Sequence, residues 1–240
     1  MPLPYKRILL KLSGEILKGS EPFGIDKSAC LNLAKILQQI AAAQIELAVV
    51  IGGGNIFRGA QIQALGIPRT PSDQIGMLST LVNGIALQQT LESIQCPSVV
   101  LSALECPKVA ESYTWQKAQA ALGQKKIIIF VGGTGNPYFT TDTAAALRAG
   151  EIQADVLMKA TKVDGIYDKD PLKYPDAKKY EKITYEQFLA QKLQVMDATS
   201  VALCMSSKIP IRVFNMNLLL QGKINDVLTK PHIGTLVTGD

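Results

Sequence analysis

The sequence predicts an α/β fold in which an open, mainly parallel sheet is covered by helices on both faces. Short runs of apolar and β-branched residues alternate along the chain with longer segments of helical periodicity. The run 127–131 is apolar throughout, as is typical of a strand that is buried on both faces of a parallel sheet. This alternation predicts helical crossovers that pack against the sheet.

Local signals define the expected elements in chain order. Asp26 precedes the first helix and Asp73 starts a long one, while Thr184 has capping-box spacing to Gln187. The predicted strands are 5–12, 47–51, 98–101, 126–131, 155–160, 211–214 and 235–237. The predicted helices are 27–43, 73–94, 115–122, 142–149 and 185–192, with one more after Asp197. Residues 164–182 are rich in Asp, Lys, Tyr and Pro, which predicts a solvated excursion from the sheet.

Composition limits the class of protein. With 240 residues, 47% of them hydrophobic, the chain can bury a large core as one domain or as two close lobes that meet near residues 150–155. The net charge of +5 comes from scattered Lys and Arg, which argues against nucleic-acid binding and favours small anionic ligands. No apolar run reaches the roughly 20 residues that cross a bilayer, and the first residues do not resemble a cleavable leader, so we expect no membrane association.

Cysteine and histidine usage narrows the chemistry further. The cysteines at positions 30, 96, 106 and 204 have no Cys-x-x-Cys spacing, which predicts reduced thiols and a cytoplasmic location. His232 is the only histidine and lies beside Pro231 in a tail. A His-dependent nucleophile system would need that one residue, and a His-rich zinc site is excluded.

Glycine-rich turns follow three of the predicted strands. Gly132, Gly133 and Gly135 follow the strand 126–131 and precede a helix that Thr141 or Asp142 would cap. Such a turn leaves main-chain amides free, and the helix start adds partial positive charge, so an anion is favoured there.

The same layout occurs twice more. Gly52–Gly54 follows the second strand, and Ser13-Gly14 follows the first, with Lys11 at its tip. Because ligands of open α/β sheets bind at the carboxyl ends of strands, the three ends predict one shared cleft for a phosphorylated ligand. For any one of these turns by itself, a plain tight connection is the better explanation.

Two common nucleotide-binding motifs are absent from the sequence. Gly19 and Gly24 have the spacing of a P-loop, but Ile25-Asp26 follows where Lys-Ser/Thr is required. The first strand is followed by a single Gly14 instead of a Gly-x-Gly-x-x-Gly fingerprint, so a dinucleotide-binding dehydrogenase fits poorly.

Six segments of the chain form a specific set. They are 11–15, 51–59, 76–78 with Asn83, 133–142, 159–167 and 210–215. As a set, and over nearly the whole chain, they resemble the bacterial uridylate kinases of the amino-acid-kinase fold.

The resemblance implies a single amino-acid-kinase-like αβα sandwich over residues 1–240, with an acceptor (UMP) half at roughly 1–150 and a donor (ATP) half at roughly 151–240. It implies transfer of the γ-phosphoryl group of ATP to UMP, giving UDP and ADP, in pyrimidine nucleotide biosynthesis. It also implies a homohexamer that GTP activates and UTP inhibits.

The resemblance gives the reaction to Lys11, Arg58 and Asp142. Lys11 would hold its ammonium against the transferring phosphoryl group, Arg58 would bind phosphate oxygens, and Asp142 would orient the lysine. Phosphoryl transfer needs alignment and charge neutralisation, and no protein nucleophile. From the residues alone, a solvated charge for Lys11 and a capping role for Asp142 remain open alternatives.

Three binding sets are implied by the same resemblance. The ATP set is Lys11, Leu12, Ser13, Gly14, Gly54, Arg58, Thr161, Lys162, Tyr167 and Asp170. The UMP set is Gly53, Asp73, Thr134, Gly135, Asn136, Pro137, Tyr138, Phe139, Thr140 and Thr141. The GTP set is Gly19, Ser20, Glu21, Pro22, Phe23 and Gly24, for which a plain connecting loop is the alternative. Mg²⁺ would bind mainly through ATP oxygens and waters, without a protein site of its own.

Several residues have ordinary alternatives. Asp73 would accept hydrogen bonds from the UMP ribose, but aspartate is also a strong helix cap. Lys159, Asp155 and Asp197 are weaker candidates, because a strand end or a helix start explains each of them by solvation or capping.

Other activities of the same fold also fit parts of the sequence. Gln74-Ile75 and Ser206-Ser207 depart from the family pattern, which usually has an aromatic or His and an Asp-Asn pair there. Acetylglutamate kinase or carbamate kinase would phosphorylate a carboxylate or carbamate, and Arg58, Asp73 and the turn 136–141 argue against both. A nucleotide sensor without catalysis is disfavoured because the candidate catalytic lysine and aspartate are both present.

Overall fold

The computed structural model describes residues 4–57, 65–230 and 232–239. Its strands are β1 (Arg7–Leu12), β2 (Glu46–Ile51), β3 (Ser98–Ser102), β4 (Glu111–Ser112), β5 (Ile127–Val131), β6 (Val156–Thr161), β7 (Ile166–Tyr167), β8 (Lys179–Tyr180), β9 (Lys182–Thr184), β10 (Ile211–Asn215) and β11 (Thr235–Thr238). Its helices are the 3-10 helix η1 (Gly14–Leu17) and the α-helices α1 (Lys27–Ala42), α3 (Arg69–Ser93), α4 (Trp115–Gly123), α5 (Thr141–Glu151), α6 (Tyr185–Ala190), α7 (Ala198–Ser207), α8 (Met216–Leu220) and α9 (Ile224–Thr229).

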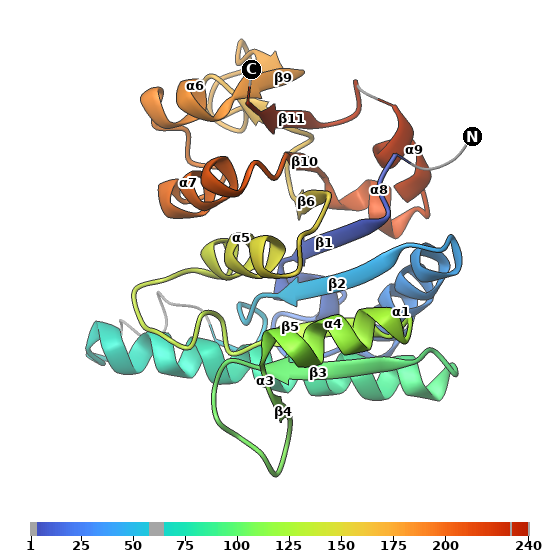
Figure 1. Cartoon of the computed structure of the whole chain (residues 1–240). Helices are drawn as coiled ribbons and strands as arrows, with labels where there is room; N and C mark the ends of the chain where they lie inside the picture. The colour runs from blue at the N-terminus through green and yellow to red at the C-terminus, as the bar shows by residue number, and fades with distance from the viewer. Residues whose placement is uncertain (1–3, 58–64, 231, 240) are drawn as a thin grey trace.

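The predicted mainly parallel sheet is confirmed. Within the described residues, nine strands form one sheet in the order β4-β3-β5-β2-β1-β6-β10-β11-β9 (Figure 1). Neighbours from β4 to β10 are parallel, whereas β11 pairs antiparallel with β10 and parallel with β9. Strands β7 and β8 form a separate antiparallel pair.

Helices cover both faces of this sheet, as the sequence predicted. Leu10 and Val49 face one side, where the core also contains residues of α1, α3, α8 and α9. Leu9 and Ala48 face the other side, which packs with α4, α5, α6 and α7. Successive residues of a strand point to opposite faces, so an uninterrupted apolar strand serves both cores. Each fully buried leucine contributes about 1.5–3 kcal/mol to stability.

The carboxyl ends of β1, β2 and β5 lie at one edge of the sheet, because β2 pairs in parallel with both of the others. This edge is on the left in Figure 1. Lys11 and the two glycine-rich turns after β2 and β5 therefore occupy the same edge, as predicted. Strand β1 has β2 on one side and β6 on the other, so this is also the point at which the chain switches sides, where such folds bind ligands.

The start of α3 differs from the prediction. The helix begins at Arg69 after Pro68, and not at Asp73, which lies within its second turn. Pro71 occupies the first turn, where a missing N–H costs no helical hydrogen bond. The N-cap alternative for Asp73 is therefore wrong.

The predicted caps of the other helices are mostly present. Asp26 and Asp197 accept main-chain N–H groups at the starts of α1 and α7, and Thr184 and Gln187 form the predicted capping box. The excursion 164–182 contains the short pair β7 and β8, which sequence periodicity does not reveal because two residues carry no measurable period. None of the described helices is both long and apolar enough to span a bilayer.

Candidate active site

A buried ion triad lies where β1 and β6 approach the start of α5. The Nζ atom of Lys11 lies 2.5 Å from Oδ1 of Asp142. The ammonium of Lys159, on β6, contacts the other oxygen of the same carboxylate and donates to the Val195 carbonyl at 2.7 Å. None of the three charged side chains is more than 13% exposed. One carboxylate thus lies between two ammonium groups, and the triad carries a surplus positive charge.

The pKa shifts in the triad follow from burial and from these contacts. Burial would raise the pKa of Asp142, but the ammonium groups of Lys11 and Lys159 outweigh it and hold that pKa below its ordinary value. Burial and the like charge of Lys11 lower the pKa of Lys159, against the attraction of Asp142. The carboxylate is therefore ionised at neutral pH, and an anion bound near the lysines would relieve their repulsion.

The cap of α5 explains why Asp142 is available for this role. Thr140, and neither Thr141 nor Asp142, is the N-cap, and its hydroxyl accepts the N–H groups of Asp142 and Thr143. The capping alternative for Asp142 is therefore wrong. Asp197 accepts the hydroxyl protons of Thr140 at 2.5 Å and Thr143 at 2.8 Å, which ties the starts of α5 and α7 together.

Lys11 is followed by a close approach of two main-chain turns. A Cβ atom added to Gly14 would lie 2.3 Å from the Gly52 carbonyl oxygen and 2.3 Å from Oδ1 of Asn55. No side chain fits at such distances, so glycine is required at position 14. The N–H of Gly52 also donates to the Leu12 carbonyl at 3.0 Å, which fixes the two turns against each other.

The turn after β5 depends on left-handed backbone. Gly132 and Gly133 have φ of 77° and 59°, a region that favours glycine. The N–H of Gly132 donates to the hydroxyl of Thr80 on α3 at 2.8 Å. This bond fixes the turn against α3.

A cavity of about 180 Å³ lies between α3 and the start of α5. It is lined by Gly53, Gly54, Phe57, Ser72, Asp73, Gly76, Met77, Thr80, Gly133, Phe139, Thr140 and Thr141. Of the residues predicted for the acceptor, it brings together Gly53, Asp73, Phe139, Thr140 and Thr141. The others, Thr134, Gly135, Asn136, Pro137 and Tyr138, are not part of its lining.

Asp73 holds the segment around Tyr138 against α3. Its carboxylate accepts the N–H of Tyr138 at 2.7 Å and the Nε–H of Arg69 at 2.8 and 2.9 Å. Tyr138 has a φ of 72°, which is unusual for a tyrosine, and the Arg69 guanidinium lies 5.5 Å from its ring centre. The hydrogen bond that Tyr138 donates to Asp73 therefore supports a strained backbone at the rim of the cavity.

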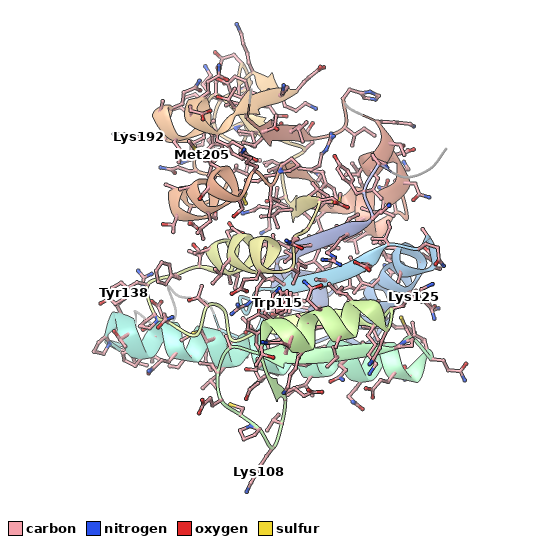
Figure 2. The ribbon with its side chains drawn as sticks, in the orientation of Figure 1. Lys108, Trp115, Lys125, Tyr138, Lys192 and Met205 are labelled. Carbon is pink, nitrogen blue, oxygen red and sulfur yellow. The ribbon has the colours of Figure 1, made fainter. Side chains whose placement is uncertain are left out.

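A second cavity, of about 520 Å³, lies beside β7 and the segment 191–195. Thr161, Tyr167 and Asp170 from the predicted donor set line it. The Tyr167 hydroxyl donates to Asp164, and this hydrogen bond raises the pKa of Tyr167 to about 12. Lys192, from the lining of this cavity, and Tyr138 lie on the same side of the molecule (Figure 2), and α5 and α7 lie between them (Figure 1).

Gly54 of the predicted donor set lines the smaller cavity, and several other members of that set lie outside both cavities. The Leu12 side chain is buried, and the Ser13 hydroxyl accepts the N–H of Glu15 at 3.4 Å to cap η1. Lys162 is 71% exposed and pairs with Glu15 at 2.7 Å. Arg58 lies outside the described residues.

The loop proposed for GTP, Gly19–Gly24, lies on the surface. Its Phe23 side chain is 73% exposed. Asp155 accepts the main-chain N–H groups of Lys6 and Arg7, so its carboxylate binds the start of β1 and caps none of the described helices.

Comparisons with known proteins decide the family. The amino acid kinase family matches residues 6–215. The uridylate kinase of Protochlamydia amoebophila is 62% identical over 232 residues, which cover 97% of this chain and 92% of the relative. The uridylate kinase of Pseudomonas aeruginosa is 48% identical over 233 residues, covering 97% and 94%. The chain belongs to the uridylate kinases of the amino acid kinase family.

Solved structures agree with this family. The UMP kinase of Bacillus anthracis superposes with a TM-score of 0.93 at 35% identity, covering 99% of this chain and 97% of that one. The UMP kinase of Ureaplasma parvum gives 0.91 at 38% identity, covering 97% and 98%. The resemblance of the sequence motifs to uridylate kinases is therefore confirmed, and the chain is an enzyme.

Sequence reasoning gave too little weight to some residues of this uridylate kinase family member. Lys159 has a buried ion pair, although it was only a weak candidate, and Arg69 was not a candidate at all. Asn55 and Asn83 belong to the family motifs, but their pairing depends on a contact between β2 and α3 that no local pattern encodes. A partial signal for Lys159 did exist, because it is a charged residue within the apolar strand β6, where a buried charge needs a partner.

Proposed function

We propose that this enzyme transfers the γ-phosphoryl group of ATP to UMP, giving UDP and ADP in pyrimidine nucleotide biosynthesis. The observation that carries the proposal is a buried triad with surplus positive charge between two cavities. Thr141 lines the smaller cavity and immediately precedes Asp142. Val195 lines the larger cavity and accepts a hydrogen bond from Lys159. A phosphoryl group passing between the two nucleotides would meet the triad.

Each member of the triad has a distinct task in this reaction. Lys11 neutralises charge on the oxygens of the transferring group, which is the main requirement of phosphoryl transfer. Asp142 holds the Lys11 ammonium at 2.5 Å and so fixes its direction. Lys159 holds Asp142 from the other side. Arg58 is proposed to bind the phosphates as well, on the strength of the family motif.

The smaller cavity is the proposed UMP site. Asp73 would accept hydrogen bonds from the ribose hydroxyls, since a carboxylate offers about four acceptor positions and this one is 21% exposed. Gly53 and the segment 134–141 would contact phosphate and uracil. The lining of this cavity falls within the proposed acceptor half, 1–150.

The larger cavity is the proposed ATP site, and its volume is within the range usual for ligands of this size. Thr161, Lys162, Tyr167 and Asp170 would lie along adenine and ribose. The turns containing Leu12, Ser13, Gly14 and Gly54 would approach the phosphates. The lining falls within the proposed donor half, 151–240.

Mg²⁺ is proposed to enter with the nucleotide. Both oxygens of Asp142 already contact lysines, so phosphate oxygens and waters are the better ligands. The ion would supply additional positive charge, while the protein residues supply alignment.

The test is an assay of the purified chain with ATP and Mg²⁺ against UMP, CMP and N-acetylglutamate. Chromatography of the products should show UDP and ADP forming in equal amounts with UMP as the preferred acceptor. Preference for N-acetylglutamate would overturn the assignment in favour of another amino acid kinase. Calorimetric binding of both nucleotides without turnover would point to a sensor and would also overturn it.

The proposed homohexamer is supported by the outer face of α3. Between Asp73 and Glu92 this helix contains no charged residue, and Leu78 and Val82 on its outer face are each 49% exposed. A surface of this kind is typical of contacts between subunits. Sedimentation velocity should show an oligomer, and replacing both Leu78 and Val82 by Lys should dissociate it. Unchanged sedimentation of that variant would contradict the use of this face.

Regulation by GTP and UTP, and a cytoplasmic location, stay predictions of the family resemblance and of the cysteine pattern. The loop Gly19–Gly24 is the proposed GTP site. Titration of each nucleotide at subsaturating UMP should raise turnover with GTP and lower it with UTP. An absence of either response would remove that part of the proposal.

A further inference from the structure

Two buried asparagine side chains form a reciprocal pair behind the candidate site. Asn55 follows the glycine turn of β2 and is 2% exposed, while Asn83 lies on the inner face of α3 and is 0% exposed. The Nδ2 of Asn55 donates to Oδ1 of Asn83 at 3.0 Å, and the Nδ2 of Asn83 donates to Oδ1 of Asn55 at 2.7 Å. Each amide therefore has one N–H left for another partner.

Both remaining N–H groups bind main-chain carbonyls of loops at the site. Asn83 donates to the Gly52 carbonyl at 2.8 Å, and Asn55 donates to the Gly24 carbonyl at 2.8 Å. The N–H of Gly24 returns a hydrogen bond to the Asn55 carbonyl at 2.7 Å. All four amide hydrogens of the pair are thus used, and they join the Gly52 turn, α3 and the end of the loop Gly19–Gly24.

The pair also borders the turn that follows Lys11. A Cβ on Gly14 would lie 2.3 Å from Oδ1 of Asn55 and 2.9 Å from Nδ2 of Asn83. The main chain at Gly14 therefore rests directly on the two amides, so a shift of either amide would displace it.

We propose that Asn55 and Asn83 are positioning residues that fix the Gly52–Gly54 turn relative to the Lys11–Gly14 turn. Through Gly24, the same pair couples the surface loop Gly19–Gly24 to the phosphate-binding turns. The inference rests on the proposed function, because its consequence is the alignment of the two nucleotides. A misplacement of about 1 Å at a distance from the reacting atoms can cost roughly 100-fold in rate.

The test compares Asn83→Ala with Asn55→Ala, with the double variant and with Thr90→Val. Thr90 lies on the same helix, and its hydroxyl donates to the Ala86 carbonyl at 2.7 Å, away from both cavities. Thr90→Val is the control for a purely structural defect. It should lower Tm slightly and leave kcat and both KM values unchanged.

Each asparagine variant should lower kcat by roughly 10- to 100-fold and raise KM for both ATP and UMP. Loss of folded protein alone would lower kcat without moving KM, so the KM values separate positioning from stability. The kcat of the double variant should be no more than about twofold below that of either single variant, because each single change already breaks the same hydrogen-bonded pair. If the kcat losses of the two single variants multiplied in the double variant, the proposal would be overturned. Unchanged KM values in the asparagine variants would also overturn it.

Asn83→Ser provides a milder second variant, and Asn55→Ala tests the pair independently if the variants at Asn83 do not fold.

The link to the surface loop Gly19–Gly24 is tested by Gly24→Ala. Gly24 has a φ of 87° with nothing within 4 Å of an added Cβ, so alanine strains only the backbone. It should reduce kcat in the wild type and have a smaller effect in Asn55→Ala, which loses the side-chain bond to Gly24 and keeps only the main-chain one. An equal effect in both backgrounds would overturn the coupling.

Failure of this inference is distinguishable from failure of the proposed function. If wild-type protein does not phosphorylate UMP with ATP, the function is wrong and the inference falls with it. If wild-type protein is active and the asparagine variants have normal KM and kcat, only the inference is wrong.

Discussion

Asp142→Asn tests the buried triad most directly, because it keeps the shape of the side chain and removes the negative charge that both Lys11 and Lys159 contact. Removing one partner of a buried ion pair costs about 3–5 kcal/mol. The penalty for leaving Lys159 charged and unpaired has an upper limit, because the side chain can release its proton instead. From an ordinary pKa of 10.5, that release at pH 7 costs about 5 kcal/mol, at about 1.4 kcal/mol per pKa unit. We therefore expect a loss of about 3–5 kcal/mol in the free energy of unfolding and a fall in Tm of about 10 °C.

The loss of unfolding free energy in Asp142→Asn should depend on pH in a defined direction. Without Asp142, the pKa of Lys159 falls further below its unfolded value of 10.5. Between the folded and unfolded pKa values the unfolded chain binds more protons, so the folded variant gains stability as pH rises. The difference in unfolding free energy between wild type and Asp142→Asn should therefore narrow between about pH 7 and pH 10.

Urea unfolding at about pH 7 and about pH 10, at one protein concentration, measures this difference in unfolding free energy. The matched control is Asp176→Asn, because Asp176 is 76% exposed and pairs with Lys169 at 2.5 Å. The free energy of unfolding of this control should fall by less than about 1 kcal/mol at pH 7 and at pH 10. A loss at Asp142 as small as that of the control, or a difference that does not narrow at high pH, would refute the reasoning.

Three further predictions concern single contacts. Lys11→Ala should lower kcat by roughly 100-fold or more with a modest loss of UMP binding, and near-normal turnover in steady-state kinetics would contradict its catalytic role. Asp73→Asn should raise KM for UMP by roughly tenfold and KM for ATP much less, and equal changes in the two would argue against a ribose contact. Gly14→Ala places a Cβ 2.3 Å from the Gly52 carbonyl oxygen, so it should cost about 1–3 kcal/mol or more in urea unfolding. A wild-type unfolding midpoint would show that the two turns can separate freely.

Much of the candidate site could be predicted because chemistry and local pattern coincide in it. Lys11 is the penultimate residue of β1, just before Leu12-Ser13-Gly14, so its place near the sheet edge follows from the strand itself. The structure places Asp73 in the lining of the smaller cavity, but the predicted helix begins four residues late because Pro68 and Pro71 obscure the true beginning. Capping preferences alone did not choose among Thr140, Thr141 and Asp142, since each is an acceptable N-cap.

The partners of buried polar groups could not be predicted in the same way. Lys159 and Asp142 are brought together by the pairing of β6 with β1 and the packing of α5 on the sheet. Asn55 and Asn83 meet only because α3 packs behind the turn of β2. Such contacts join residues far apart in the chain, and no local propensity specifies them.

The sequence by itself determined the alternation of strands and helices, the parallel sheet with two apolar faces, and the glycine turns that mark its functional edge. These follow from side-chain periodicity and from backbone conformations that only a few residues adopt. Only the tertiary structure decided which charges share a buried site and which amides hold the turns. Desolvation and hydrogen bonding between distant segments depend on what surrounds each group after folding, and that surrounding exists only in the packed chain.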